Sequence, residues 1–254
     1  MRDGPAAGPP RPEVEALALA RRLVALEEGE IRAGAAARHL AALDPASGAR
    51  VVAAVVRGTD VELRAAAAAI ARAIADPRGA LPYAWLADAY AAAAEEALDE
   101  VTALLVSPPP RKAWIEPRDR ADPRLARLTL GHKKALARVN RDPDLLARLA
   151  AEGDPVVVRE LLANSQLTEE FVVRIAARRP CRPSTLRCIW EARRWRSRTA
   201  VALAIARNPY AETGIALGIL PVLGAAELRE IATDGALHPL VRALADRIVR
   251  HRIP

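Results

Sequence analysis

The feature that most constrains the fold is an internal repeat in the second half of the chain. Residues 149–164 and 231–245 run through the same order of features: a helix end, a short turn, a proline, aliphatic residues, an arginine and a further apolar run. Residues 198–209 form a looser third copy. Units of this kind bury their apolar faces against their neighbours, because one unit alone cannot bury its own. The repeat therefore predicts a stack of short helices.

The composition agrees with an all-α fold. Hydrophobic residues make up 52% of the 254 residues, which is enough for a core, but only 3% are aromatic and many of the rest are alanines. Alanine is the best helix former, whereas sheets favour the β-branched and aromatic residues. We therefore expect closely packed helices and no sheet.

Helix starts are marked by residues that can cap a first turn. Aspartate can accept hydrogen bonds from the free N–H groups there, and a following proline fits the first helical position. Asp-Pro pairs of this kind begin at Asp44, Asp122, Asp142 and Asp154, and two hydroxyl caps are expected at Thr168 and Ser184.

The chain divides into four predicted segments. Residues 1–12 are rich in Gly and Pro and are expected to be a disordered tail, and residues 13–106 a helical domain. Its helices are expected near 13–27, 30–42, 46–57, 60–75 and 81–106. A run of three prolines opens a charged linker over 107–122, since prolines favour an extended connector. The repeat domain spans 123–254.

The repeats resemble a known architecture. Short helices with Asp-Pro or Asn-Pro at the turns, and a second helix like Val156-Val157-Val158-Arg159, make residues 123–250 similar to the HEAT-like and leucine-rich repeat variant solenoids of bacteria. The resemblance implies that these residues form a right-handed α-solenoid of short helix pairs that serves as a binding scaffold. The helices expected over 13–106 form an N-terminal helical bundle or the start of the solenoid. One variant-repeat protein carries an iron–sulfur cluster on a Cys-rich extension. This chain has only Cys181 and Cys188, so no cofactor is expected.

Charge is distributed unevenly between the halves. Arginine is the habitual basic residue, since only three of the 38 basic residues are lysines, so the distribution is more informative than the total. Residues 1–106 carry a net charge of −4 and residues 107–254 a net charge of +11. This asymmetry indicates an anionic partner for the second half.

The positive charge is densest in residues 178–198, which we name the Arg/Trp region. It holds eight arginines and two tryptophans, opposed only by Glu191. Arginine binds carboxylates and phosphates in a bidentate manner, and tryptophan offers a flat recognition surface. The alternative interpretation is a solvated turn whose Trp rings lie in the core beneath arginines. The predicted partner-binding residues are Arg178, Arg179, Arg182, Trp190, Arg193, Arg194, Trp195, Arg196 and Arg198.

A second basic run covers residues 111–141, where Lys134 and Arg138 are one helical turn apart. Its alternative interpretation is a solvated first helix of the repeat domain. Cys188, beside Ile189 and Trp190, is expected in the core, and the two cysteines alone are too few for a metal site. The four histidines share no motif with cysteine or paired acids, and no P-loop or dinucleotide-binding glycine pattern occurs, so neither a catalytic residue nor a metal site is predicted.

These observations predict a cytoplasmic, non-enzymatic scaffold that binds a protein partner through an acidic segment. The longest apolar stretch, 81–106, contains five carboxylates, which excludes it as a membrane span. The alternative function is nucleic-acid binding in the manner of HEAT-like proteins that cradle duplex DNA. A DNA glycosylase of that architecture is a weaker alternative, because no acid here matches the catalytic position of such enzymes.

Overall fold

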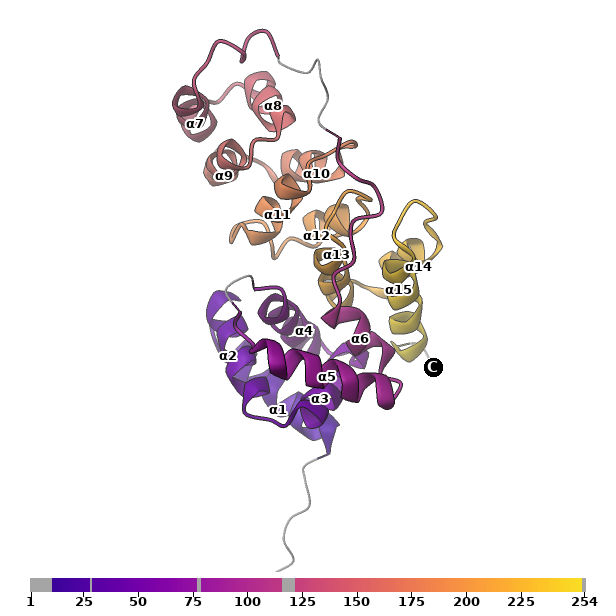
Figure 1. Ribbon diagram of the computed structural model, residues 1–254. Helices are drawn as coiled ribbons and strands as arrows, with labels where there is room; N and C mark the ends of the chain where they lie inside the picture. The colour runs from indigo at the N-terminus through magenta and orange to yellow at the C-terminus, as the bar shows by residue number, and fades with distance from the viewer. Residues whose placement is uncertain (1–10, 28, 77–78, 116–121, 253–254) are drawn as a thin grey trace, which may run out of the picture. The chain divides into compact units, whose positions relative to one another are not determined.

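The computed structural model describes residues 11–27, 29–76, 79–115 and 122–252. Within these ranges the chain forms α-helices and one short 3-10 helix, and no strand occurs there, as the composition predicted (Figure 1). The chain divides into two compact units. Unit 1 comprises Met1–Val106, Leu220–Arg229 and Ala243–Pro254, and unit 2 comprises Ser107–Ile219 and Glu230–Arg242.

This division differs from the predicted segments at the C-terminal end. The expected boundary after residue 106 coincides with the boundary between the units, but two stretches of the expected repeat domain, Leu220–Arg229 and Ala243–Pro254, belong to unit 1. Ten residues of the expected N-terminal tail, 1–10, lie outside the described residues. The first helix already includes Pro12, which takes a position that needs no N–H group.

Unit 1 is built mainly from six helices that bury many alanines. They are α1 (Pro12–Val24), α2 (Gly29–Ala41), α3 (Pro45–Arg57), α4 (Val61–Ile74), α5 (Tyr83–Glu95) and α6 (Asp99–Leu105). Helix α4 packs against α1 and α2, and α3 packs against α1 and α5. The largest fully buried side chains include Leu19, Leu23, Leu40 and Ile70. Alanine on the facing surfaces permits these close approaches.

One such approach joins α3 and α5. Gly48 lies under the ring of Trp85, and a Cβ atom at position 48 would come within 2.4 Å of the ring. The indole Nε1 of Trp85 donates to the carbonyl oxygen of Leu43 at 3.1 Å, which fixes the ring over the glycine. Position 48 therefore has no room for a side chain larger than that of glycine.

The prediction of a single helix over 81–106 is wrong, because the structure contains α5 and α6 with a break between them. Ala97 adopts a left-handed conformation with φ of 54°. The backbone N–H of Leu98 donates to the carbonyl of Ala93, and that of Ala97 to the carbonyl of Ala94. This pair of bonds is a Schellman ending, which glycine usually provides. No glycine marks this turn, because alanine occupies the left-handed position.

The last described residue, Arg252, ties three segments of unit 1 together. Its guanidinium donates to the carbonyl oxygens of Leu223, Pro221 and Val56 at 3.1, 2.7 and 3.1 Å. Burial lowers the pKa of Arg252 to about 10, and the nearby charge of Arg64 acts in the same direction. The side chain therefore holds the C-terminal segment on the N-terminal helices of this unit.

Unit 2 contains the short helices predicted from the repeat. They are α7 (Leu130–Val139), α8 (Pro143–Glu152), α9 (Pro155–Ala163), α10 (Glu169–Ala177), α11 (Pro183–Glu191), α12 (Thr199–Ala206) and α13 (Thr213–Ile219). The division between the units falls within α14 (Ala225–Thr233) and within α15 (Pro239–Arg252), and the 3-10 helix η1 spans Leu220–Val222. Helices two apart in the chain pack together, namely α7 with α9, α9 with α11, and α10 with α12.

The predicted caps are confirmed with two exceptions, at Asp122 and Ser184. Asp122 begins no helix, because residues 123–127 form turns in which its side chain accepts from Arg124 N at 2.9 Å, and α7 starts only at Leu130. Side chains of Asp44, Asp142, Asp154 and Thr168 accept backbone N–H bonds at the first turns of their helices. The expected cap at Ser184 is wrong. Helix α11 begins one residue earlier at Pro183, so Arg182 takes the capping position and makes no side-chain cap bond.

Two buried asparagines tie successive helices of unit 2 in the same way. The Nδ2 atom of Asn164, after α9, donates to the carbonyl oxygens of Ala137 and Asn140 at the end of α7. The Nδ2 atom of Asn208, after α12, donates to the carbonyls of Ala176 and Arg178 at the end of α10. The final carbonyls of a helix lack partners within it. Each asparagine therefore caps the helix on which its own helix packs.

Part of the predicted linker lies along unit 2. Residues 107–115 have no regular secondary structure, and residues 116–121 lie outside the described ranges. The carbonyl oxygen of Pro109 accepts from Thr213 Oγ1 at 3.1 Å, and Lys112 N donates to the carbonyl of Pro209 at 3.0 Å. The described part of this segment is thus bonded to the start of α13 and the turn before it.

Candidate interaction surface

The Arg/Trp region runs from the end of α10, through α11, to the start of α12. Its tryptophans occupy different environments. Trp195 is buried, with 3% of its surface exposed, and its Nε1 donates to the carbonyl oxygen of Leu162 at 2.8 Å. Trp190, on α11, is half-buried. For Trp195 the structure thus matches the alternative interpretation, in which the ring belongs to the core.

Arg194 covers the ring of Trp195. Its guanidinium carbon lies 4.4 Å from the ring centroid, and its two terminal nitrogens donate to the carbonyl oxygens of Asn164 and Leu167 at 2.8 and 3.0 Å. Arg194 therefore closes the turn between α9 and α10, a role that the sequence pattern did not reveal. Its partners are neutral carbonyls, so its positive charge is fixed in place and not neutralised by them.

Three further arginines of the region have partners within unit 2. Arg179 donates to the carbonyl of Arg207 at 2.6 Å, and Arg198 approaches Glu169 at 3.7 Å. The guanidinium of Arg182 lies 5.9 Å from the ring centroid of Trp114, in the segment before α7. Of these three contacts, only that of Arg198 is with a carboxylate.

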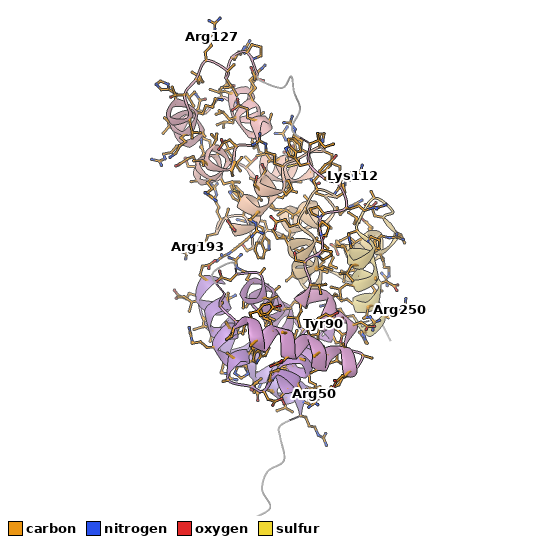
Figure 2. All side chains as sticks on the ribbon, in the orientation of Figure 1. Arg50, Tyr90, Lys112, Arg127, Arg193 and Arg250 are labelled. Carbon is orange, nitrogen blue, oxygen red and sulfur yellow. The ribbon has the colours of Figure 1, made fainter. Side chains whose placement is uncertain are left out.

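The remaining predicted residues lie at or near the surface. Arg193 is exposed after α11 (Figure 2). Arg196 and Arg178 are half-buried. Arg187, on α11, was not predicted as a binding residue. It forms a bidentate pair with Glu212, with Nε to Oε1 at 2.7 Å, and this hydrogen bond raises the pKa of Arg187. Arg187 is therefore committed to the fold.

Arg178 also lines a groove between α8 and α10. The groove has a volume of about 350 Å³, and its floor is apolar, formed by Ala150, Phe171 and Ile175. Its rim carries Pro143, Asp144, Ala147, Arg174 and Arg178. Sequence reasoning named only Arg178. The spacing Phe171, Arg174, Ile175, Arg178 could have indicated the rest, since it alternates apolar and basic residues on one face of a helix.

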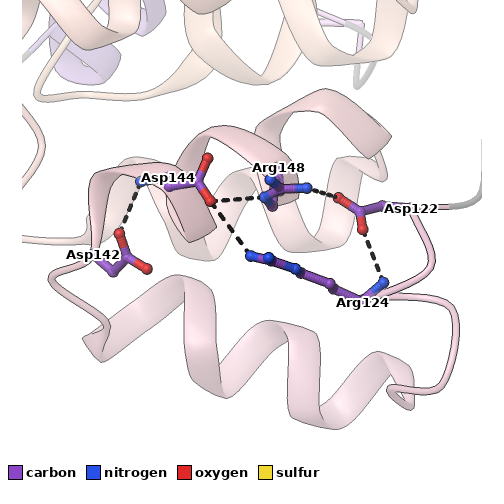
Figure 3. A network of polar contacts seen from close by, with 5 residues as sticks. All are labelled: Asp122, Arg124, Asp142, Asp144 and Arg148. Carbon is purple, nitrogen blue, oxygen red and sulfur yellow. Dashed lines mark hydrogen bonds and ion pairs between the residues drawn. The ribbon is translucent and has the colours of Figure 1, made fainter.

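A polar network stiffens the α8 side of this groove (Figure 3). Arg148 bridges two carboxylates, with Nε to Asp144 Oδ2 at 2.8 Å and Nη1 to Asp122 Oδ2 at 3.0 Å. Arg124 lies 3.8 Å from the same Asp144 oxygen, and Asp142 caps the helix by accepting from Asp144 N. The hydrogen bond from Arg148 lowers the pKa of Asp122. The charge of Asp144 is therefore balanced by arginines outside the groove.

The positive charges that the second basic run places on α7 are paired with carboxylates of neighbouring helices. Lys133 pairs with Glu152 at 2.7 Å, and Glu160 on α9 receives both Lys134 at 3.9 Å and Arg138 at 2.8 Å. The expectation that Lys134 and Arg138 share a face of one helix is confirmed by this common partner. The run offers less net positive charge than its sequence indicates.

Both cysteines lie in the core, where only Cys188 was expected. Both are buried free thiols, and burial raises the pKa of Cys181 to about 11 and also raises that of Cys188. Such thiols are poor nucleophiles at neutral pH. Within the described ranges no cluster of three or more His, Cys, Asp or Glu side chains is arranged to hold a metal ion. Nor do those ranges contain a helix with the length and apolar character needed to cross a membrane.

Arginines lie beside an apolar groove on short helices braced by asparagine and arginine bonds to carbonyls. Comparisons of the chain with protein-family models, with curated protein sequences and with solved structures gave no match.

Proposed function

We propose that this chain is a non-enzymatic binding scaffold that captures a protein partner through an acidic segment. The observation that carries the proposal is the bonding of Arg179 and Arg194. Both donate to backbone carbonyls, so their charges are held in place without being cancelled. Fixed cations lose little conformational freedom when a carboxylate arrives, which favours binding.

The scaffold that we propose for unit 2 is a right-handed α-solenoid of HEAT-like helix pairs. The packing of helices two apart in the chain supports this arrangement. The equivalent bonds of Asn164 and Asn208 support it further, since the tie between α9 and α7 recurs three helices later between α12 and α10. Solenoids of stacked repeats commonly present binding surfaces.

A protein partner accounts for the charges better than duplex DNA does. Duplex binding needs successive phosphate contacts along a groove or track. The second basic run, which could extend such a track, is paired with Glu152 and Glu160. The concentrated charge of the Arg/Trp region fits a short acidic segment, and nucleic-acid binding remains the alternative that the test below examines.

The test selects ligands for the full chain from a random peptide library displayed on phage. We expect the selected peptides to be enriched in Asp and Glu. Replacing Arg193 and Arg196 with Glu should weaken their binding, while Arg194 is left intact because it supports the turn. The matched control replaces Arg127 and Arg141, two exposed arginines of the same unit, with Glu. Circular dichroism checks that both double variants are folded.

Two outcomes would overturn the proposal. One is selection of peptides without acidic enrichment, or binding that both double variants weaken equally. The other is tight, strongly salt-dependent binding of a labelled DNA duplex with no capture of acidic peptides, which would favour the nucleic-acid alternative.

A further inference from the structure

The groove between α8 and α10 combines an apolar floor with basic side chains along one edge. Helix α8 contributes Pro143, Ala147 and Ala150, spaced so that they share one face of the helix. Helix α10 contributes Phe171 and Ile175 to the floor. A volume of about 350 Å³ lies at the low end of the range of ligand pockets in proteins, which is roughly 300–1,000 Å³.

The basic edge consists of Arg174 and Arg178, one turn apart on α10. Among the residues that the structure describes, neither guanidinium has a carboxylate within ion-pair distance. Arg174 instead lies over Phe171, with its guanidinium carbon 5.4 Å from the ring centroid. The one carboxylate on the rim, Asp144, is bonded to Arg148. The groove is therefore bordered by positive charge that a partner could neutralise.

We propose that this groove is the anchoring site for the acidic segment, and that the segment inserts an apolar side chain between two carboxylate-bearing residues. This inference rests on the proposed function. Successive side chains of an extended segment point to opposite sides. The apolar side chain would therefore face Ala147 and Ala150 of α8, while the carboxylates on either side of it would pair with Arg174 and Arg178 of α10. Arginines one turn apart on a helix are about 5–6 Å apart at Cβ, and side chains two residues apart in an extended segment are separated by about 6.5–7 Å. The two spacings are similar, and the long arginine side chains can bridge the difference.

A protein segment fits this groove better than a single-stranded nucleic acid does. Bases bind such proteins by stacking on open aromatic faces. The only aromatic side chain on the groove lining is Phe171, which is 9% exposed and covered by Arg174. An aliphatic or aromatic side chain can use the apolar floor without an open ring face.

The experiment measures the affinity of the full chain for an acidic peptide obtained by the selection described above, by fluorescence anisotropy. Three variants are compared with the unmodified chain. The first replaces Arg174 and Arg178 with Glu, and removes the basic edge. The second, Ala147→Trp, fills the groove from an exposed rim position without changing any charge. The third, with Glu at positions 127 and 141, is the control for net charge.

We expect the first two variants to lose affinity by about tenfold or more, which corresponds to about 1.4 kcal/mol, and the control to change it less. Replacing the apolar residue of the peptide with serine should lower affinity for the unmodified chain and have little effect with Ala147→Trp. Circular dichroism of each variant checks that it is folded.

Three results would overturn the inference. Unchanged affinity in the folded Ala147→Trp variant would show that the groove is not occupied, and equal losses in the basic-edge variant and the control would show a response to net charge alone. Binding that depends on Arg193 and Arg196 but not on the groove would overturn this inference and leave the proposed function standing. If no acidic peptide is captured, the proposed function fails as well.

Discussion

Asn208 should be among the most sensitive positions of unit 2. Its side chain is buried, and Nδ2 donates to the carbonyls of Ala176 at 2.7 Å and Arg178 at 3.0 Å, while Oδ1 accepts from Tyr210 N at 3.1 Å. The substitution Asn208→Ala removes all three bonds and leaves the two carbonyls without this donor. Each lost bond costs about 0.5–1.5 kcal/mol, and a buried unsatisfied group costs about 1–3 kcal/mol. We therefore expect Asn208→Ala to lower the free energy of unfolding of unit 2 by about 3 kcal/mol.

Hydrogen exchange measured by mass spectrometry reports this loss at the right place. The free energy of opening for amides of α10 and α12 should fall by that amount, while amides of unit 1 serve as an internal reference. The matched control is Asn140→Ala. The side chain of Asn140 accepts one local bond, from Asp142 N at 2.7 Å, and the expected loss is about 1 kcal/mol or less. Equal effects of the two substitutions would refute the idea that Asn208 ties one helix to the next.

Three further predictions concern local features of both units. Gly48→Ala should destabilise unit 1 by about 1–3 kcal/mol, because a Cβ there overlaps the ring of Trp85 and overpacking costs this much; a neutral effect in urea denaturation would contradict the packing described. Ala97→Gly should stabilise unit 1 by about 0.5–1 kcal/mol, because glycine adopts the left-handed conformation without steric cost; a decrease in stability by the same measurement would argue against it. Arg148 lowers the pKa of Asp122, so the folded state binds this proton less readily than the unfolded state does. Stability from this pair is therefore present above about pH 4 and is lost as the pH falls through the folded pKa. Asp122→Asn should flatten the acid limb of the stability curve of unit 2, and an unchanged limb would count against the pair.

Local structure in this chain could be predicted well from the sequence. Aspartate and threonine caps at Asp142, Asp154 and Thr168 act at the first turns of their own helices, so the signal and the structure lie within a few residues of each other. The short helices of unit 2 followed from the spacing of those signals. The break at Ala97 was missed because alanine occupies a position where glycine would have marked the turn.

The candidate site was harder to predict because its residues are placed by tertiary contacts. The sequence shows Arg194 and Trp195 as neighbours in a basic segment, but their partners lie about 30 residues earlier in the chain, at the end of α9 and beyond it. The sequence likewise could not show that α8 and α10 border one groove. The density of arginines in the sequence indicated the Arg/Trp region. Tertiary packing determines which of those arginines remain on the surface.

The most direct test of the scaffold is hydrogen exchange of the full chain with and without a selected acidic peptide. The account predicts slower exchange in α8, in α10 and in the Arg/Trp region, since binding stabilises the segments that carry the ligand. It also predicts that unit 1 exchanges at the same rate in both states. Protection confined to unit 1, or no protection at a peptide concentration that saturates binding, would contradict the account.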